Sequence, residues 1–214
     1  MSKALQLAWT VSVLSLLAQA AVAEEKGWCP LFDGKTLDGW QQQNGTATYR
    51  VEDGAVVGKT SEGSPNSFLC TKKDYGDFEL KFEVKVDDEL NSGVQIRSVS
   101  KKEIQDGRVH GPQVEIATNG TAGYVYGESL STGWLSADTT PHTAFKSGEW
   151  NAYHVKAVGK SIKTCVNGHP VADLVDEKSG MMSGFIGLQV HGIAAGAGPY
   201  EVRWRNIEIK VLAP

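Results

Sequence analysis

The stretch HGPQVEIAT, residues 110–118, decides the fold because its side chains alternate strictly between apolar and polar. Successive side chains of a β-strand point to opposite faces, so Val114 and Ile116 share one face while Gln113 and Glu115 share the other. Such alternation is typical of a strand that covers a core with one face only. The stretch therefore predicts a half-buried strand with a polar outer face.

Two further stretches repeat this alternation, NSGVQIRS (91–98) and GLQVHG (187–192). Their polar positions are Gln95, Arg97, Gln189 and His191. Three such strands side by side would make a sheet face lined with amide, guanidinium, carboxylate and imidazole groups. We expect these side chains to converge in one hollow, and this polar face is the candidate site.

The rest of the chain also predicts strands. Residues 78–86 alternate cleanly, and Asp53-Gly54 and Asn167-Gly168 are typical hairpin turns. A change of phase near Arg205-Asn206 indicates a β-bulge. No segment after residue 23 shows the apolar spacing of an amphipathic helix. We therefore expect an all-β sandwich or jelly roll, built as a single domain over residues 24–214.

The N-terminal segment, residues 1–23, has the pattern of a signal peptide. Lys3 precedes an apolar run, and Ala21-Val22-Ala23 fits a signal peptidase site. The run is too short and too interrupted for a stable membrane span, although a membrane-anchored N-terminus is the alternative. We expect cleavage after Ala23 and an exported protein, periplasmic or extracellular, with no membrane anchor.

The composition points to a small, neutral ligand. The chain has 21 Lys and Arg against 25 Asp and Glu, with no basic block, which argues against a nucleic-acid partner. An exported location permits a disulfide, and Cys29 with Cys70 is the expected pair because Cys165 lies inside a strand pattern. No cysteine or histidine spacing matches a structural zinc site.

Several motifs resemble one known family, the 3-keto-disaccharide hydrolases. They are LFDGKTLDGW (31–40), NSGVQIRS (91–98), GYVYGE (123–128), GEWN (148–151), VNG (166–168), GFIGLQVHG (184–192) and VRWRNIEIK (202–210). The resemblance runs from about Leu31 to Leu212, with the motifs in the family's order. It implies a concanavalin-like jelly roll and the cleavage of glycosides whose sugar has first been oxidised to the 3-keto form.

The carboxylates of the polar strands do not match an ordinary glycosidase. Such enzymes flank the bond with two carboxylates, whereas the three strands supply Glu115, with Glu128 as a second from the loop after Tyr126. A 3-keto sugar makes a different demand, because the ketone acidifies the proton on C2. A base can then remove that proton, and the aglycone leaves by elimination, with water added later; hydrolysis is the other outcome.

This chemistry assigns roles to the polar positions. Glu115 or His191 would be the base, and Arg97 would stabilise the enolate. The residues expected to bind the sugar are Gln95, Gln113, Gln189 and Glu128, with Trp134 or Tyr126 as a stacking platform. A divalent metal held by Glu115 and His191 could stabilise the enolate instead. No other cofactor is expected.

Three other interpretations stay open at this point. Arg97 and Glu115 could form a structural cross-strand ion pair. The same face could belong to a carbohydrate-binding module that holds sugar without cleaving it. The chain could also be an exported structural or adhesion domain, which would close the face with side chains. The fold alone does not separate these functions.

Overall fold

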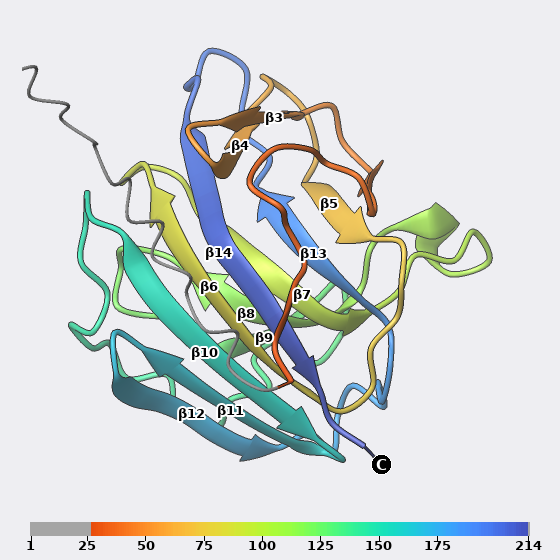
Figure 1. Cartoon of the computed structure of the whole chain (residues 1–214). Coiled ribbons are helices and arrows are strands. Elements are labelled where there is room, and N and C mark those ends of the chain that lie inside the picture. The colour runs from red at the N-terminus through yellow and green to blue at the C-terminus, as the bar shows by residue number, and fades with distance from the viewer. Residues whose placement is uncertain (1–26, 214) are drawn as a thin grey trace, which may run out of the picture.

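The computed structural model describes residues 27–213, so the expected signal peptide lies outside the described residues. Two antiparallel β-sheets stack face to face (Figure 1). Between residues 27 and 213 there is no α-helix, only a 3₁₀ turn at Gln105–Gly107, and no helix that could cross a membrane. The chain is a concanavalin-like jelly roll, as its sequence predicts.

The larger sheet has eight strands. Seven run in the order β12, β11, β10, β6, β14, β4, β3, and β1 also pairs with β14. Their bounds are β1 (Cys29–Pro30), β3 (Thr48–Glu52), β4 (Ala55–Lys59), β6 (Phe78–Val86), β10 (Asn151–Val158), β11 (Ser161–Val166), β12 (His169–Val175) and β14 (Glu201–Val211).

The smaller sheet has six strands in the order β2, β5, β13, β7, β8, β9. Their bounds are β2 (Trp40–Gln43), β5 (Ser67–Thr71), β7 (Ser92–Ser98), β8 (Gly111–Ile116), β9 (Val125–Glu128) and β13 (Phe185–Val190). The three strands predicted to form the polar face are β13, β7 and β8, and they are neighbours. The expected sheet face therefore exists.

The hydrophobic core fills the space between the sheets. The six-stranded sheet contributes Val94, Val114 and Leu188, and the eight-stranded sheet contributes Leu80 and Trp204, all fully buried. In β6, buried residues alternate with more exposed ones along the whole strand, which confirms the predicted half-buried strand. The polar faces of both sheets are thereby turned away from the core.

The predicted irregularities are confirmed. The pairing of β14 with β6 shifts register between Arg205 and Glu208, and Asn206 has a φ of 50°. This extra residue is the bulge that the change of phase indicated. The hairpins at Asp53-Gly54 and Asn167-Gly168 also form, joining β3 to β4 and β11 to β12.

Arg97 does not face the polar hollow, so the prediction for this residue is wrong. Its φ is 50°, and the pairing of β7 with β13 shifts register beside it. This left-handed residue breaks the alternation and sends the guanidinium to the end of the sandwich. There it donates to the carbonyls of Gly76 (2.7 Å) and Gly159 (2.5 Å), and to Asp77 (2.9 Å). The alternative pair with Glu115 is absent for the same reason.

The expected disulfide between Cys29 and Cys70 is also wrong. Cys29 lies in β1 of the eight-stranded sheet, and Cys70 lies in β5 of the other sheet. Both are free thiols, as is Cys165. Burial raises the pKa of the Cys70 thiol, so this sulfur is held in its neutral form.

Replacing Arg97 by Ala should destabilise the protein by about 2–4 kcal/mol, because two carbonyls and one carboxylate lose a buried cationic donor. Urea unfolding measures this. The control is Arg50→Ala, which removes partly exposed ion pairs with Glu52 and Glu201 and should cost far less. Equal losses in the two variants would show that Arg97 is not a structural anchor.

Candidate functional site

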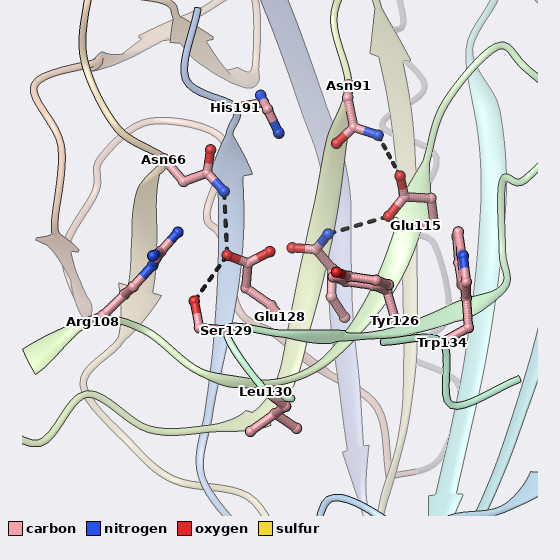
Figure 2. Close-up of a pocket in the computed structure, with 11 residues that line it drawn as sticks. Asn66, Asn91, Arg108, Glu115, Tyr126, Glu128, Ser129, Leu130, Trp134 and His191 are labelled. Carbon is pink, nitrogen blue, oxygen red and sulfur yellow. Dashed lines mark hydrogen bonds between the residues drawn. The ribbon is translucent and has the colours of Figure 1, made fainter. Parts of the chain in front are cut away.

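A polar hollow of about 410 Å³ opens on the outer face of the six-stranded sheet (Figure 2). β8 and β9 form one wall, and the first residue after β13 closes another side. Its lining residues are Asn66, Asn91, Arg108, Gln113, Glu115, Tyr126, Glu128, Ser129, Leu130, Trp134 and His191. Two carboxylates, a guanidinium and an imidazole therefore share one hollow.

The strand register explains why these side chains meet. Gln113 of β8 lies opposite Tyr126 of β9, and Glu115 lies opposite Gly93 of β7. A β-carbon on Gly93 would lie 2.5 Å from the side-chain carbons of Gln113. Gln113 therefore occupies the space above Gly93, from where its amide reaches Glu115. A larger residue at position 93 would displace it.

Glu115 is almost fully buried at the wall of the hollow, with 7% of its surface exposed. The amide of Asn91 donates to one carboxylate oxygen, and the amide of Gln113 donates to the other over 3.2 Å (Figure 2). Burial raises the pKa of Glu115 to about 7. The hydrogen bonds from the two amides lower this pKa, and the nearby charge of Glu128 raises it. This carboxyl group can thus give or take a proton near neutral pH.

Glu128 is the second carboxylate of the hollow. It ends β9 and is buried, and its Oε1 accepts from the Asn66 amide (3.3 Å) and the Ser129 hydroxyl (3.2 Å). The sequence predicts Glu128 in a loop after Tyr126, whereas Glu128 is the last residue of β9. It lines the same hollow as Glu115, as expected, and its role stays a prediction. Because only two neutral groups donate to Glu128, its carboxylate keeps free acceptor positions on the side of the hollow.

His191 lies at the rim, directly after β13, and is exposed. Its Nδ1 is 2.7 Å from the carbonyl oxygen of Gly192, so Nδ1 must carry the proton and donate it. Nε2 is then unprotonated in the neutral ring and can accept a proton. Figure 2 shows the ring on the same side of the hollow as Asn66 and Asn91.

Two aromatic side chains border the hollow on the β9 side. The rings of Tyr126 and Trp134 lie 5.2 Å apart at 76°, in an edge-to-face contact. Their backbones also form a bridge, so the loop after β9 is fixed against the strand. Both predicted stacking residues are thus at the hollow, but they do not form one flat strip.

Gln95 and Gln189 lie on the predicted face but are fully buried and do not line the hollow. Gln95 donates to Gln113 Oε1 over 2.8 Å, so it orients the Gln113 side chain and does not bind a ligand itself. Neither amide atom of Gln189 has a hydrogen-bond partner in residues 27–213. The prediction that these two residues line the site is wrong, because the hollow lies toward β8 and β9 and not over the middle of the sheet.

Sequence reasoning missed five lining residues, Asn66, Asn91, Arg108, Ser129 and Leu130. Asn66 and Asn91 immediately precede β5 and β7, and Arg108 belongs to the loop before β8. Side-chain parity says nothing about residues outside strands, so the alternation could not indicate them. Among the described residues, the guanidinium of Arg108 makes no hydrogen bond or ion pair, which leaves it available to a ligand.

The metal alternative gains no support from the described part of the chain. There, no three His, Cys, Asp or Glu side chains come together as a metal-binding group. The oxygens of Glu115 already accept from two amide groups. The metal alternative for Glu115 and His191 stays a prediction.

Comparison with known proteins gives one family. A family model described as the 3-keto-alpha-glucoside-1,2-lyase-like domain matches residues 27–210. This match confirms the resemblance seen in the motifs. No curated protein matches the chain.

Solved structures share the fold at low identity. A putative glycosyl hydrolase from Parabacteroides distasonis is 21% identical, with a TM-score of 0.65 over 87% of this chain and 94% of its own. The Bacillus licheniformis beta-glucanase is 12% identical (TM-score 0.61, 87% and 97%). The carbohydrate-binding module CBM66 from Bacillus subtilis is 16% identical (TM-score 0.56, 79% and 94%). The same fold therefore carries both catalytic and binding proteins.

The raised pKa of Glu115 makes stability depend on pH. The folded protein holds this proton more tightly than the unfolded chain, whose pKa is near the usual 4.5. The contribution of this proton to the free energy of unfolding is fully present below pH 4.5 and is lost as the pH rises through about 7. From pH 4.5 to 8, the wild type should lose about 3 kcal/mol relative to Glu115→Gln.

Urea unfolding of both proteins across this pH range measures the difference. The control is Glu103→Gln, at an exposed position, which should track the wild type at every pH. A constant difference between wild type and Glu115→Gln would show that the buried carboxyl does not titrate in this range.

Proposed function

The chain belongs to the family of 3-keto-alpha-glucoside-1,2-lyase-like domains, and from that premise we propose that it cleaves the glycosidic bond of 3-keto glycosides. The observation that carries the proposal is the position of Glu115, a buried carboxyl group at the wall of a polar hollow. Burial there raises its pKa to about 7. A general base is most effective when its pKa is near the working pH. The ordinary glycosidase mechanism does not require such a base beside C2.

The proposed reaction begins at C2 of the oxidised sugar. The Glu115 carboxylate takes the C2 proton, and the electrons of that C–H bond move toward the C3 carbonyl to form an enolate. The enolate then forms a C1–C2 double bond and expels the aglycone oxygen from C1. The leaving oxygen takes one proton, so the elimination itself consumes no water. Addition of water to the double bond afterwards would complete a net hydrolysis.

Arg108 takes the role that the sequence assigned to Arg97. Its guanidinium lines the hollow without a protein partner, so it can donate to the developing oxyanion at C3. His191 is the second group that can transfer a proton at the rim. Its Nε2 would pass a proton from solvent to the leaving oxygen.

The remaining lining residues suit a sugar ligand. The volume is within the range of about 300–1,000 Å³ that small-molecule pockets have. Glu128 and Asn66 present an acceptor and a donor to hydroxyl groups, and Trp134 offers an apolar ring at the border. We therefore propose a small saccharide as ligand, without assigning its aglycone.

A carbohydrate-binding module is the rival function. The fold shared with CBM66 is compatible with it. Tyr126 and Trp134 meet edge to face, however, which does not provide the flat aromatic strip expected of a binding module. A binding module would also have no need of a buried carboxyl group that titrates near neutral pH.

Release of free sugar from a 3-keto disaccharide tests the function. We expect turnover of the oxidised disaccharide and none of its unoxidised parent, because only the ketone acidifies the C2 proton. Glu115→Gln should lower kcat/KM by about 10²–10⁴-fold. In the wild type, kcat/KM should rise with pH through about 7, because Glu115 acts as a base in its ionised form, and deuterium at C2 should slow the reaction.

Other results would contradict parts of this proposal. Binding of the oxidised disaccharide without turnover would favour the carbohydrate-binding module. Turnover that is insensitive to deuterium at C2 would exclude rate-limiting proton removal. Full activity in both Glu115→Gln and His191→Ala would remove these two residues from the mechanism.

We also propose that the protein is exported. The support is the N-terminal sequence, with Lys3, the apolar run that follows it, and Ala21-Val22-Ala23. Expression in a Gram-negative host should yield mature protein outside the cytoplasm with Glu24 as its first residue, as read by N-terminal sequencing. Protein that stays in the cytoplasm with residues 1–23 attached would contradict export.

A further inference from the structure

Arg108 lies at the end of an exposed loop, yet its backbone is held firmly. Residues 101–106 are all exposed, whereas Val109 and His110 are buried. The Arg108 carbonyl accepts from His110 Nδ1 over 2.8 Å, and its N–H donates to the Gln105 carbonyl over 3.2 Å. A cation that must meet an oxyanion is thus anchored where the loop rejoins the sheet.

Asn44 fixes the residues on both sides of Arg108. Its Nδ2 donates to the Gly107 carbonyl over 3.1 Å, and its Oδ1 accepts from the Val109 N–H over 2.7 Å. Asn44 itself follows β2, on the opposite edge of the six-stranded sheet from β9, and is more than 60 residues away in sequence. One side-chain amide therefore clamps the two residues that flank the arginine.

We propose that Asn44 is a positioning residue that holds Arg108 at the hollow. This inference rests on the proposed function, in which Arg108 stabilises the enolate. Asn44 does not line the hollow, so it acts through Arg108 and does not contact the sugar. An arginine on an unclamped loop would lose alignment with the reacting oxygen, and small misplacements of a catalytic group are costly.

The test uses Asn44→Gly. Asn44 has a φ of 55°, which Gly adopts without strain, whereas Ala would add backbone strain to the lost hydrogen bonds. The matched control is Asn206→Gly. Asn206 also has a positive φ of 50° and donates its amide to a side chain, but it lies in β14 of the other sheet.

We expect Asn44→Gly to lower kcat on the 3-keto disaccharide by about 10- to 100-fold. Arg108→Ala should lower it by about 10²-fold. The double variant should be no slower than Arg108→Ala alone, because the clamp has nothing left to position. Added guanidinium ion, at non-denaturing concentration, should rescue Arg108→Ala and the double variant equally. Asn206→Gly should keep the wild-type rate.

Hydrogen exchange gives a readout that does not depend on activity. The Val109 amide should exchange faster in Asn44→Gly than in the wild type, and Asn206→Gly should leave it unchanged. Multiplicative losses of kcat in the double variant, or an unchanged Asn44→Gly, would overturn the positioning role. Full activity of Arg108→Ala, or no turnover by the wild type, would contradict the proposed role of Arg108. In that case the exchange data would still show whether Asn44 holds the loop in place.

Discussion

The register between β7 and β8 is the constraint on which the site depends. It places Glu115 opposite Gly93, and the missing side chain of Gly93 gives Gln113 the space from which it donates to Glu115. The same two strands turn Val94 and Val114 into the core. A slip of one residue would exchange the two faces of a strand, so the apolar core holds the buried carboxyl in place.

The period-two pattern was enough to predict the strands β6, β7, β8 and β13 and one half of the site. Residues inside regular strands, such as Glu115 and Gln113, lie where alternation places them. Arg97 does not, because its own left-handed backbone turns the side chain to the other face of the strand. The alternation of residue types does not reveal such a backbone change. Arg108 and Asn66 come from loops, whose course depends on contacts distant in sequence. The sequence therefore indicated the face but not the position of the hollow on it.

The hollow concentrates charge at a cost to stability. Glu115 is buried near a second carboxylate, and only neutral amides donate to its oxygens. A nearby arginine pair would have lowered its pKa and reduced its strength as a base. The structure instead commits Arg97 to Asp77 at the end of the sandwich and keeps Arg108 unpaired at the hollow. The arginine that anchors the end of the sandwich and the arginine at the hollow are thus different residues.

The strand order has a consequence for folding. β13 lies between β5 and β7, and β14 lies between β6 and β4, so the last two strands of the chain enter the middle of their sheets. A chain that lacks them has neither sheet complete and no His191 at the hollow. Pairings between such distant segments form slowly. Both sheets are therefore completed only when β13 and β14 insert between strands that precede them in the sequence.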